Sequence, residues 1–541
     1  MIKVYSGHWA AGGLGIGCLL SAVLGLLSCG GGSTADAALC EATQYGVSSS
    51  LPDNTAALQA ALASCAGRAM HVSSGIYIFA PALAYSDANG FGQGIAIPDG
   101  TSIVGDGPGK TTFRINGPGN YVSFLWIQDV SNVSIRDLTL EGNNARDPPP
   151  PAGAPACYYD YGHAITIQST NRPVADISIA STELISFTGT SWISILAAEG
   201  GPGVGVAGGP VTIDGNYFKS VPGNAVEPEQ IVCSASAVAI EGLGSDEVAT
   251  ASNVTVSGNV VDADYIKSGV AVWSGASQIT IANNAIRNAG KGLPVPDKYS
   301  NGSYAILVYH HHSVPPATTV FVRPTSIDIV GNEIINPYSC GIYVAGAQNV
   351  RIVGNLISGQ IDTYDVTEPR AAIGLNHLNN DFGGVQTPVS DNQVDDSAIG
   401  ISIAGGVLPV VDSNVVGSIP SGGVGMKLNG IADDAMTLTL TNTSIAARAS
   451  AADVSSVIGF FPSAAITIDG LYQTGAAYPL RWFTNIVATS AQSHRGYCSF
   501  LAFGSVNHVF VREPGCWGFG DCQSPQLGYW PNFGAGCAPG T

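Results

Sequence analysis

A short element that recurs along the middle of the chain limits what this sequence can fold into. Each copy alternates apolar and polar residues and ends in Asn. Copies that align by hand lie at residues 254–259, 279–284, 327–332 and 350–355, with Asn216, Asn392 and Asn414 in equivalent places. Strict alternation predicts β-strands with one buried face. A unit repeated at this interval predicts coils that stack on their neighbours rather than one globular core.

A second recurring element precedes the first within each repeat. Its copies lie at residues 164–167, 192–195, 237–240, 269–272, 305–308, 341–344, 372–375 and 400–403. We interpret it as the first strand of each coil. Long amphipathic helices are nearly absent, and the fold class expected is therefore all-β, a single-stranded right-handed parallel β-helix. Aligned positions then form columns about 4.8 Å apart along one face.

The N-terminal part of the chain supports this interpretation. Asp53, Asn54 and Thr55 precede an apolar stripe that predicts a capping helix, and residues 71–78 predict a pair of strands. Together with Tyr45-Gly46-Val47, Gly75-Ile76-Tyr77 and residues 103–111, this segment resembles the N-terminal cap and first coil of the pectate-lyase-like superfamily. The resemblance implies the fold. It does not choose among the lyases, hydrolases, epimerases and phage tailspikes of that superfamily.

In such a fold, the recurring Asn occupies the tight turn between the second and third strands of each coil. Asn tolerates left-handed backbone, and its amide can hydrogen-bond from one coil to the next. We therefore interpret the Asn series as structural rather than catalytic.

The charge balance limits the partners. The chain holds 20 Lys and Arg against 39 Asp and Glu, a net charge of −19. Phosphate binding requires clustered cations, so no nucleic-acid partner is expected. A polysaccharide that is neutral or modestly acidic is an easier ligand, and a monomer is expected.

The first residues predict export. Lys3 precedes an apolar stretch at residues 9–27, and no acidic residue occurs before Asp36. The stretch ends in Leu-Leu-Ser-Cys, which resembles a bacterial lipoprotein signal with lipid attached to Cys29. Cleavage near residues 35–37 and a retained membrane anchor are the alternatives. We expect the protein either to be held in the cell envelope by a lipid anchor or to be secreted. The lipid anchor would be its only contact with the membrane.

These features divide the chain into five parts. They are a signal peptide at residues 1–28, a linker at 29–39, the N-terminal cap and first coil at 40–98, the β-helix at 99–480 and a Cys-rich C-terminal cap at 481–541.

In an oxidising compartment we expect disulfides within three groups, Cys40 with Cys65, Cys157 with Cys233, and Cys498, Cys516, Cys522 and Cys537. Cys340 is then a packed thiol.

Outward columns on the first-strand face carry the candidate site, since the sugar-binding groove of the superfamily usually lies there. One column holds Glu241, Trp273, Tyr309 and Asn376, and Tyr343 is a further candidate for sugar contact. Aromatic rings stack on sugar faces while polar groups recognise hydroxyls. The alternative is that these rings only cover the sheet.

Two more columns carry groups suited to catalysis. Lys267 and Arg370 lie three coils apart and could neutralise uronate carboxylates. His310 and His377 share the next column and could move a proton. The alternatives are solvated charges at loop ends and an ordinary polar turn. A lower-ranked cluster is Asp160-Tyr161-Gly162-His163.

The standard catalytic motifs of the superfamily are missing. Asp395-Asp396 and Asp433-Asp434 lack the flanks of the polygalacturonase set, and Trp126-Ile127-Gln128-Asp129 only loosely matches a pectate-lyase signature.

We expect a polysaccharide lyase acting by β-elimination on a uronate. A glycoside hydrolase, with Glu241 as one carboxylate, and a non-catalytic glycan-binding or partner-binding protein are the alternatives. Ca²⁺ is the one cofactor considered, with Asp262 and Asp264 as contributors.

Overall fold

The protein is described from a computed structural model of the chain. The residues that it describes are 40–80, 84–85, 92–116, 123–142, 162–187, 191–198, 201–205, 209–220, 236–242, 250–292, 303–310, 322–360, 371–377, 386–405, 408–429, 437–448, 455–460, 465–474, 478–482, 486–493, 500–502 and 509–511. The signal segment, the linker and Cys29 lie outside these ranges. Within them, no helix is long and apolar enough to span a bilayer.

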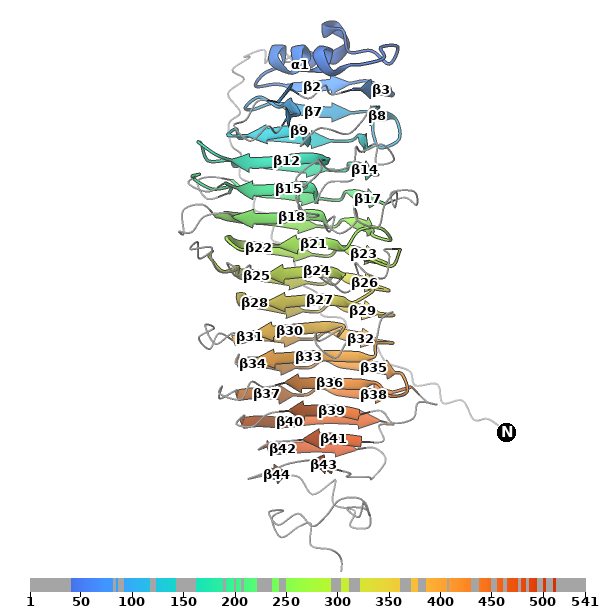
Figure 1. The fold of residues 1–541 in the computed structure, drawn as a ribbon, viewed down its shortest axis with the longest axis vertical. Coiled ribbons are helices and arrows are strands. Elements are labelled where there is room, and N and C mark those ends of the chain that lie inside the picture. The colour runs from blue at the N-terminus through green and yellow to red at the C-terminus, as the bar shows by residue number, and fades with distance from the viewer. Residues whose placement is uncertain are drawn as a thin grey trace, which may run out of the picture. The chain divides into compact units, whose positions relative to one another are not determined.

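The described strands repeat in sets of three. From β6 (Ile95–Ala96) to β37 (Thr437–Thr441), each strand pairs in parallel with the strand three places further along, as β18 (Ser236–Gly242) does with β21 (Ser268–Val272) and β19 (Ala251–Ser257) does with β22 (Ala276–Ala282). One set of three strands is one coil, and Figure 1 shows successive coils one above another. The chain is therefore a right-handed parallel β-helix, as the sequence predicted.

Within the described ranges, the first strands of the coils form one 14-stranded parallel sheet, called here the first sheet. Its strands are β6 (Ile95–Ala96), β9 (Ser123–Gln128), β12 (His163–Ser169), β15 (Ser191–Ala197), β18, β21, β24 (Tyr304–Tyr309), β27 (Cys340–Ala345), β30 (Ile373–His377), β33 (Ile399–Gly405), β36 (Val424–Asn429), β39 (Ser455–Phe460), β41 (Tyr478–Trp482) and β43 (Phe500–Ala502). All eight first strands expected from the sequence lie in this sheet.

The second and third strands of the coils are joined into one sheet, because β40 (Ala465–Thr474) pairs with both β37 and β38. The second strands are β1 (Cys40–Glu41), β2 (Ala69–Val72), β7 (Ser102–Gly105), β10 (Val133–Arg136), β13 (Ile177–Ala180), β16 (Val211–Asp214), β19, β22, β25 (Thr325–Val330), β28 (Gln348–Val353), β31 (Gln386–Ser390), β34 (Leu408–Asp412), β37 (Thr437–Thr441), β40, β42 (Ile486–Ser493) and β44 (Val509–Val511). The third strands are β3 (Gly75–Phe79), β8 (Thr111–Ile115), β11 (Thr139–Glu141), β14 (Glu183–Ile185), β17 (Tyr217–Lys219), β20 (Val260–Asp262), β23 (Ala285–Arg287), β26 (Glu333–Ile335), β29 (Leu356–Ser358), β32 (Gln393–Asp395), β35 (Val415–Ile419) and β38 (Ser444–Ala447). A short antiparallel pair, β4 (Ala84–Tyr85) and β5 (Gly92–Gln93), stands apart.

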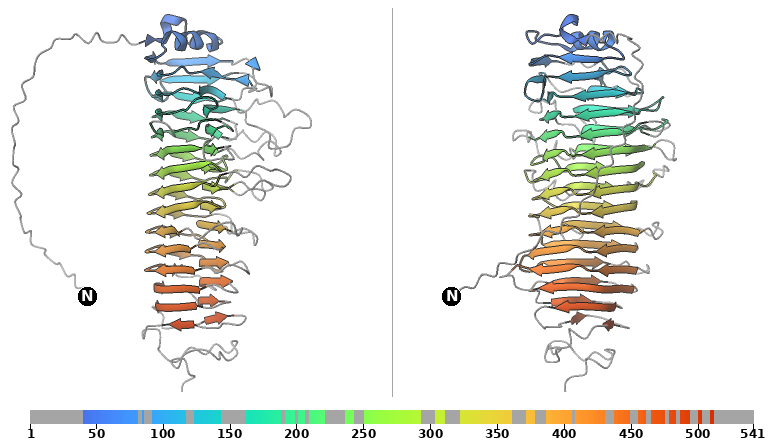
Figure 2. Two further views of the ribbon diagram at one scale, coloured as in Figure 1. Left: turned by 90° about the vertical axis from the view of Figure 1, so that its left-hand side faces the viewer. Right: turned by 180° about the vertical axis from the view of Figure 1, so that it is seen from behind.

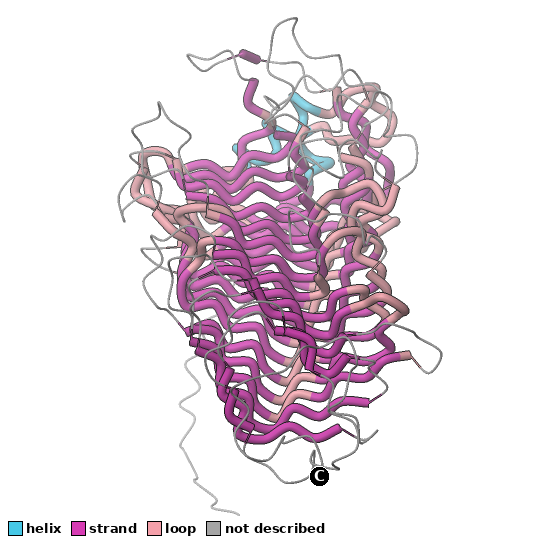
Figure 3. Tube along the Cα trace, turned by 60° about the horizontal axis from the view of Figure 1, so that its bottom comes forward, coloured by secondary structure: helices cyan, strands magenta, loops and turns pink. Residues whose placement is uncertain are grey.

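The core fills the space enclosed by the coils. Val238, Val270, Ile306 and Ile342 pair in register along the first sheet, and each is at most 1% exposed. Stacked in this way, aliphatic side chains bury a continuous apolar column. Packing at the corner is close, because a Cβ on Gly341 would lie 2.7 Å from the carbonyl oxygen of Ala372. Figure 3 shows the strands running in parallel along the stack.

The Asn series forms the predicted ladder. Asn216, Asn259, Asn284, Asn332, Asn355, Asn392 and Asn414 are at most 2% exposed, and each Nδ2 donates to the Oδ1 of the next Asn at 2.9–3.0 Å. The expected backbone conformation was wrong by one position. Positive φ belongs to the preceding residue, such as Gly258 at 61° or Asn283 at 55°. The left-handed residue makes the turn, which leaves the following Asn free to point inward.

The N-terminal segment contains the expected helix. α1 (Thr55–Ser64) follows a 3₁₀ turn, η1 (Ala42–Tyr45), and Leu58, Ala61 and Leu62 are buried. Asn54 is the N-cap residue and makes no side-chain capping hydrogen bond, while the carboxylate of Asp53 accepts hydrogen bonds from the backbone N–H and the hydroxyl of Thr55. The Asn54 side chain instead accepts from the backbone N–H of Ser48. The strands of residues 71–78 are consecutive but not paired with each other, because β2 pairs with β7 and β3 with β8.

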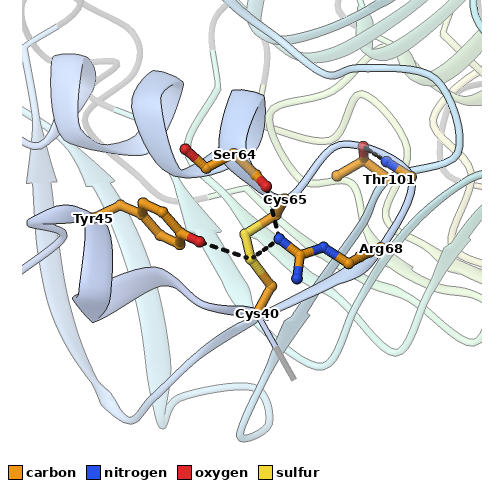
Figure 4. Close-up of a disulfide and its surroundings, with 7 residues drawn as sticks. Cys40, Tyr45, Ser64, Cys65, Arg68 and Thr101 are labelled. Atoms are coloured by element: carbon orange, nitrogen blue, oxygen red, sulfur yellow. Dashed lines mark hydrogen bonds between the residues drawn. A yellow bond between two sulfur atoms is a disulfide. The ribbon is translucent and has the colours of Figure 1, made fainter. Parts of the chain in front are cut away.

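A disulfide joins Cys40 to Cys65, which confirms that predicted pair. Figure 4 shows it between β1 and the end of α1, with Arg68 beside it. The Arg68 Nη2 donates to the Cys40 Sγ at 3.3 Å and to the Ser64 carbonyl oxygen at 2.7 Å. The other predicted pairing groups, including the whole Cys-rich C-terminal group, lie outside the described residues. Strand pairing continues past residue 480 to β44 (Figure 2).

His71 links three layers at this end of the β-helix. Its Nδ1 lies 2.9 Å from Glu41 and its Nε2 lies 2.9 Å from Asp106. The hydrogen bond to Glu41, with that to Asp106, raises the pKa of His71 above its usual 6.5. Hydrogen bonds from Ser74 and His71 lower the pKa of Asp106 from 3.8 to about 2. The charged forms of both groups are therefore stabilised by folding.

Replacing His71 by Asn is expected to destabilise the N-terminal coils in a pH-dependent manner. A raised His pKa contributes stability that is complete below 6.5 and is lost as the pH rises through the folded value. The Asp106 contribution is complete above 3.8 and is lost as the pH falls toward about 2. The difference in unfolding midpoint between the native chain and the variant should be largest between these limits. A difference that grows above neutral pH would contradict stabilisation by a charged His71 between Glu41 and Asp106.

Candidate functional site

A second hydrophobic cluster lies on the outer face of the first sheet, separate from the core. Its buried members are Ala271, Tyr304, Leu307, Cys340, Tyr343 and Ala345, and Trp273 and Tyr309 pack against them half-buried. We call these eight residues the outer cluster. They come from β21, β24 and β27 and the residue after β21, so strand pairing alone brings them together.

The rings of the outer cluster form two pairs. Tyr304 and Tyr343 stack with ring centroids 4.8 Å apart and planes 12° apart, and both are at most 5% exposed. Trp273 and Tyr309 meet edge to face at 5.9 Å. The buried pair thus supports the half-buried pair, which keeps some surface accessible to a ligand.

The predicted polar partners flank these rings. Tyr309, Ala345 and Asn376 pair in register, and Asn376 Nδ2 donates to the Tyr343 hydroxyl at 2.9 Å. Glu241, in β18, precedes Trp273 in the same column, because Ile240 pairs with Val272. Glu241 and Asn376 are both half-buried. The structure therefore places Glu241, Trp273, Tyr309 and Asn376 in one column beside Tyr343, as the alignment of coils predicted.

Two of the predicted catalytic residues, Lys267 and His310, are buried. Lys267, just before β21, is 1% exposed, and His310, just after β24, is 6% exposed. Arg370 lies outside the described residues, and only the backbone of His377, in β30, is described. His310 follows Tyr309 as His377 follows Asn376, so the two histidines share a column two coils apart. Their proposed catalytic roles stay predictions.

Cys340 and His163 are two further residues whose surroundings the structure describes. Cys340 is buried, as predicted, although it packs in the outer cluster and not in the core. His163 is 3% exposed, with its Nδ1 in contact with the carbonyl oxygen of Ser191, while Asp160 and Tyr161 are outside the described ranges. That contact assigns His163 a structural role on β12.

The proposed calcium contributors do not converge. Asp262, at the end of β20, accepts a hydrogen bond from the Tyr217 hydroxyl, which raises the pKa of Tyr217 to about 12. Oδ1 of Asp264 is buried and has no hydrogen-bond partner. No set of three His, Cys, Asp or Glu residues within the described ranges could hold a metal ion. Asp262 and Asp264 are therefore not part of such a set in the described part of the chain.

Two residues that the sequence interpretation missed lie further along the first sheet. Leu307, Tyr343, Gly374, Ser402 and Lys427 pair in register as one outward column. Ser402 is fully buried, and Lys427 is half-buried. Met-Lys-Leu at residues 426–428 continues the alternation, and that signal could have identified Lys427.

Comparison with known proteins gives low similarities. No protein-family model matches the chain, and no curated protein matches it significantly. One similar solved structure is the A-module of the mannuronan C-5 epimerase AlgE6 of Azotobacter vinelandii, with a TM-score of 0.43 and 12% identity, covering 88% of this chain and 99% of that one.

Two more solved structures are similar at the same level. The catalytic unit of the GH87 α-1,3-glucanase of Streptomyces thermodiastaticus has a TM-score of 0.47 and 12% identity, covering 88% of this chain and 69% of that one. The surface adhesin PfbA of Streptococcus pneumoniae has a TM-score of 0.43 and 13% identity, covering 87% and 97%. The activities of these proteins are not carried over to this chain.

Proposed function

We propose that this protein is an exported enzyme that cleaves a polysaccharide by β-elimination on a uronate. The sugar chain would lie on the outer face of the first sheet. The observation that carries the proposal is the outer cluster, in which a buried ring pair supports the half-buried Trp273 and Tyr309. Export, either secreted or with lipid on Cys29, and a monomeric state belong to the same proposal.

The arrangement accounts for binding as follows. Trp273 and Tyr309 would stack on the apolar faces of sugar rings, where flat contact excludes water. Glu241 and Asn376 lie on either side of the two rings in the same column and would hydrogen-bond sugar hydroxyls. Tyr343 accepts a hydrogen bond from Asn376 and would fix the orientation of its amide.

For the elimination step, a base removes the proton on carbon five of a uronate. The bond from carbon four to the leaving oxygen then breaks, a double bond forms between carbons four and five, and the leaving oxygen takes up a proton from water or from the protonated base. His310 or His377 would take the proton, and Lys267 and Arg370 would stabilise charge on the carboxylate. Lys267, His310 and His377 lie on or next to first-sheet strands, within one coil of the outer cluster.

The experiment is an incubation with pectins, alginates and glycosaminoglycans. The ultraviolet absorbance of a new double bond would support the lyase. New reducing ends without that absorbance would assign a hydrolase. If neither signal appears with any polymer of the panel but binding is retained, the result would favour a non-catalytic glycan-binding protein. This is the second candidate, because Lys267 and His310 are buried.

Replacing Trp273 by Ala is expected to weaken binding to any polysaccharide that the protein recognises by about tenfold or more, since loss of one stacked ring removes roughly 1.4 kcal/mol. Affinity electrophoresis or calorimetry measures the change. Leu356→Ala is the matched control, because Leu356 is a 38% exposed apolar residue on β29, in the other sheet. Equal affinity of both variants and the native chain would remove the outer cluster from the site.

A further inference from the structure

We propose that Lys427 and Ser402 form an anion subsite that holds the carboxylate of an acidic sugar, on the same face as the outer cluster. This inference rests on the proposed function and adds a specificity determinant to it. No motif or resemblance pointed to either residue.

The two residues lie side by side on the outer face. Ser402 of β33 pairs in register with Lys427 of β36, and Gly374 of β30 precedes them in the column. Tyr343 is the next member, and it belongs to the outer cluster. With coils about 4.8 Å apart, Lys427 lies about 14 Å from Tyr343 along the stack. A sugar chain extended along this face would therefore meet the rings first and the lysine a few units later.

Lys427 is a cation without a counter-charge. It is half-buried, and burial lowers the pKa of its ammonium group. Among the residues that the structure describes, it makes no ion pair or hydrogen bond. A charge held partly out of water without a partner is unfavourable. In a chain with 39 acidic residues, an unpaired lysine is a position that an external carboxylate can fill.

Ser402 is the second, independent observation. It is fully buried, and its Oγ is among the few buried side-chain oxygens of the described residues that have no hydrogen-bond partner. Buried hydroxyls normally have one, and an exception indicates a missing water, ion or ligand. Gly374, the preceding residue of the column, has no side chain of its own to donate to Ser402. An ammonium and a hydroxyl donor on adjacent coils match the two oxygens of a carboxylate.

The first test needs no knowledge of the natural polymer. Lysines of the full protein are reductively methylated with ¹³C, and the Lys427 resonance is assigned by its loss in Lys427→Arg. Galacturonate should shift that resonance, and galactose, which lacks the carboxylate, should not. Inorganic phosphate serves as the competing anion. No shift with galacturonate, or a shift with phosphate alone, would overturn the carboxylate assignment.

The second test separates this inference from the proposed function. Binding of polygalacturonate, alginate and a neutral glucan is measured for Lys427→Met, Ser402→Ala and Trp273→Ala. Lys427→Met should bind the acidic polymers about tenfold more weakly, with a smaller salt dependence, and Ser402→Ala should bind them several-fold more weakly. Binding of the neutral glucan should not change in either variant. If Trp273→Ala weakens binding and Lys427→Met does not, the subsite is wrong and the proposed function stands. If no variant has an effect, both are wrong.

Discussion

An Asn332→Ala variant should unfold more easily than the native chain by about 3 kcal/mol, the sum expected when buried polar groups lose their partners. Asn332 is 1% exposed. Its Oδ1 accepts from the backbone N–H and the side-chain amide of Asn284, and its Nδ2 donates to Ile281 and Asn355. Alanine removes every one of these bonds, and the Asn284 N–H then loses the side-chain oxygen to which it donates.

Denaturant unfolding measures the loss, and hydrogen exchange locates it. Because each coil contacts only its neighbours, faster exchange should be confined to the turns after β22, β25 and β28. Glu333→Ala is the matched control, since Glu333 is the next residue and is exposed. An unchanged unfolding midpoint for Asn332→Ala would show that water can replace the ladder.

Replacing Cys40 and Cys65 together by Ala should destabilise the N-terminal end by about 3 kcal/mol, as expected for a cross-link over this length of chain. The disulfide spans 25 residues and ties β1 to the end of α1. The buried Leu58, Ala61 and Leu62 of α1 pack into the core. A detached helix would expose them together with the end of the β-helix.

Limited proteolysis within residues 40–75 measures the detachment, together with the unfolding midpoint. A reducing agent should make the native chain as sensitive as the double variant in this segment and should not change the variant further. Equal protease resistance of the native chain and the variant would mean that packing of α1 alone holds this end closed.

The coils could be predicted because their signals are local. Alternation over four to six residues defines each strand, and the interval between copies defines the stack, so the first strands from residue 164 to 403 were placed correctly. The left-handed turn residue was misplaced by one position. Sequence alone does not tell which residue of Gly258-Asn259 takes the positive φ, because both types tolerate it.

The sequence predicted which residues of the candidate site share one outward column. Alternation showed that Glu241, Trp273, Tyr309 and Asn376 face outward in one column, and the register agrees. Burial could not be predicted in the same way. Lys267 and Cys340 are both 1% exposed, and Cys340 is buried by the side chains of neighbouring coils in the outer cluster.

The sequence by itself therefore determined the coil, its strands, the Asn ladder and the columns, because all of these follow from the period of a β-strand and the interval of the repeat. Only the tertiary structure decided which outward side chains touch one another and which keep contact with solvent. The stacking of Tyr304 on Tyr343 and the burial of Ser402 depend on packing across coils, and no local pattern encodes that packing.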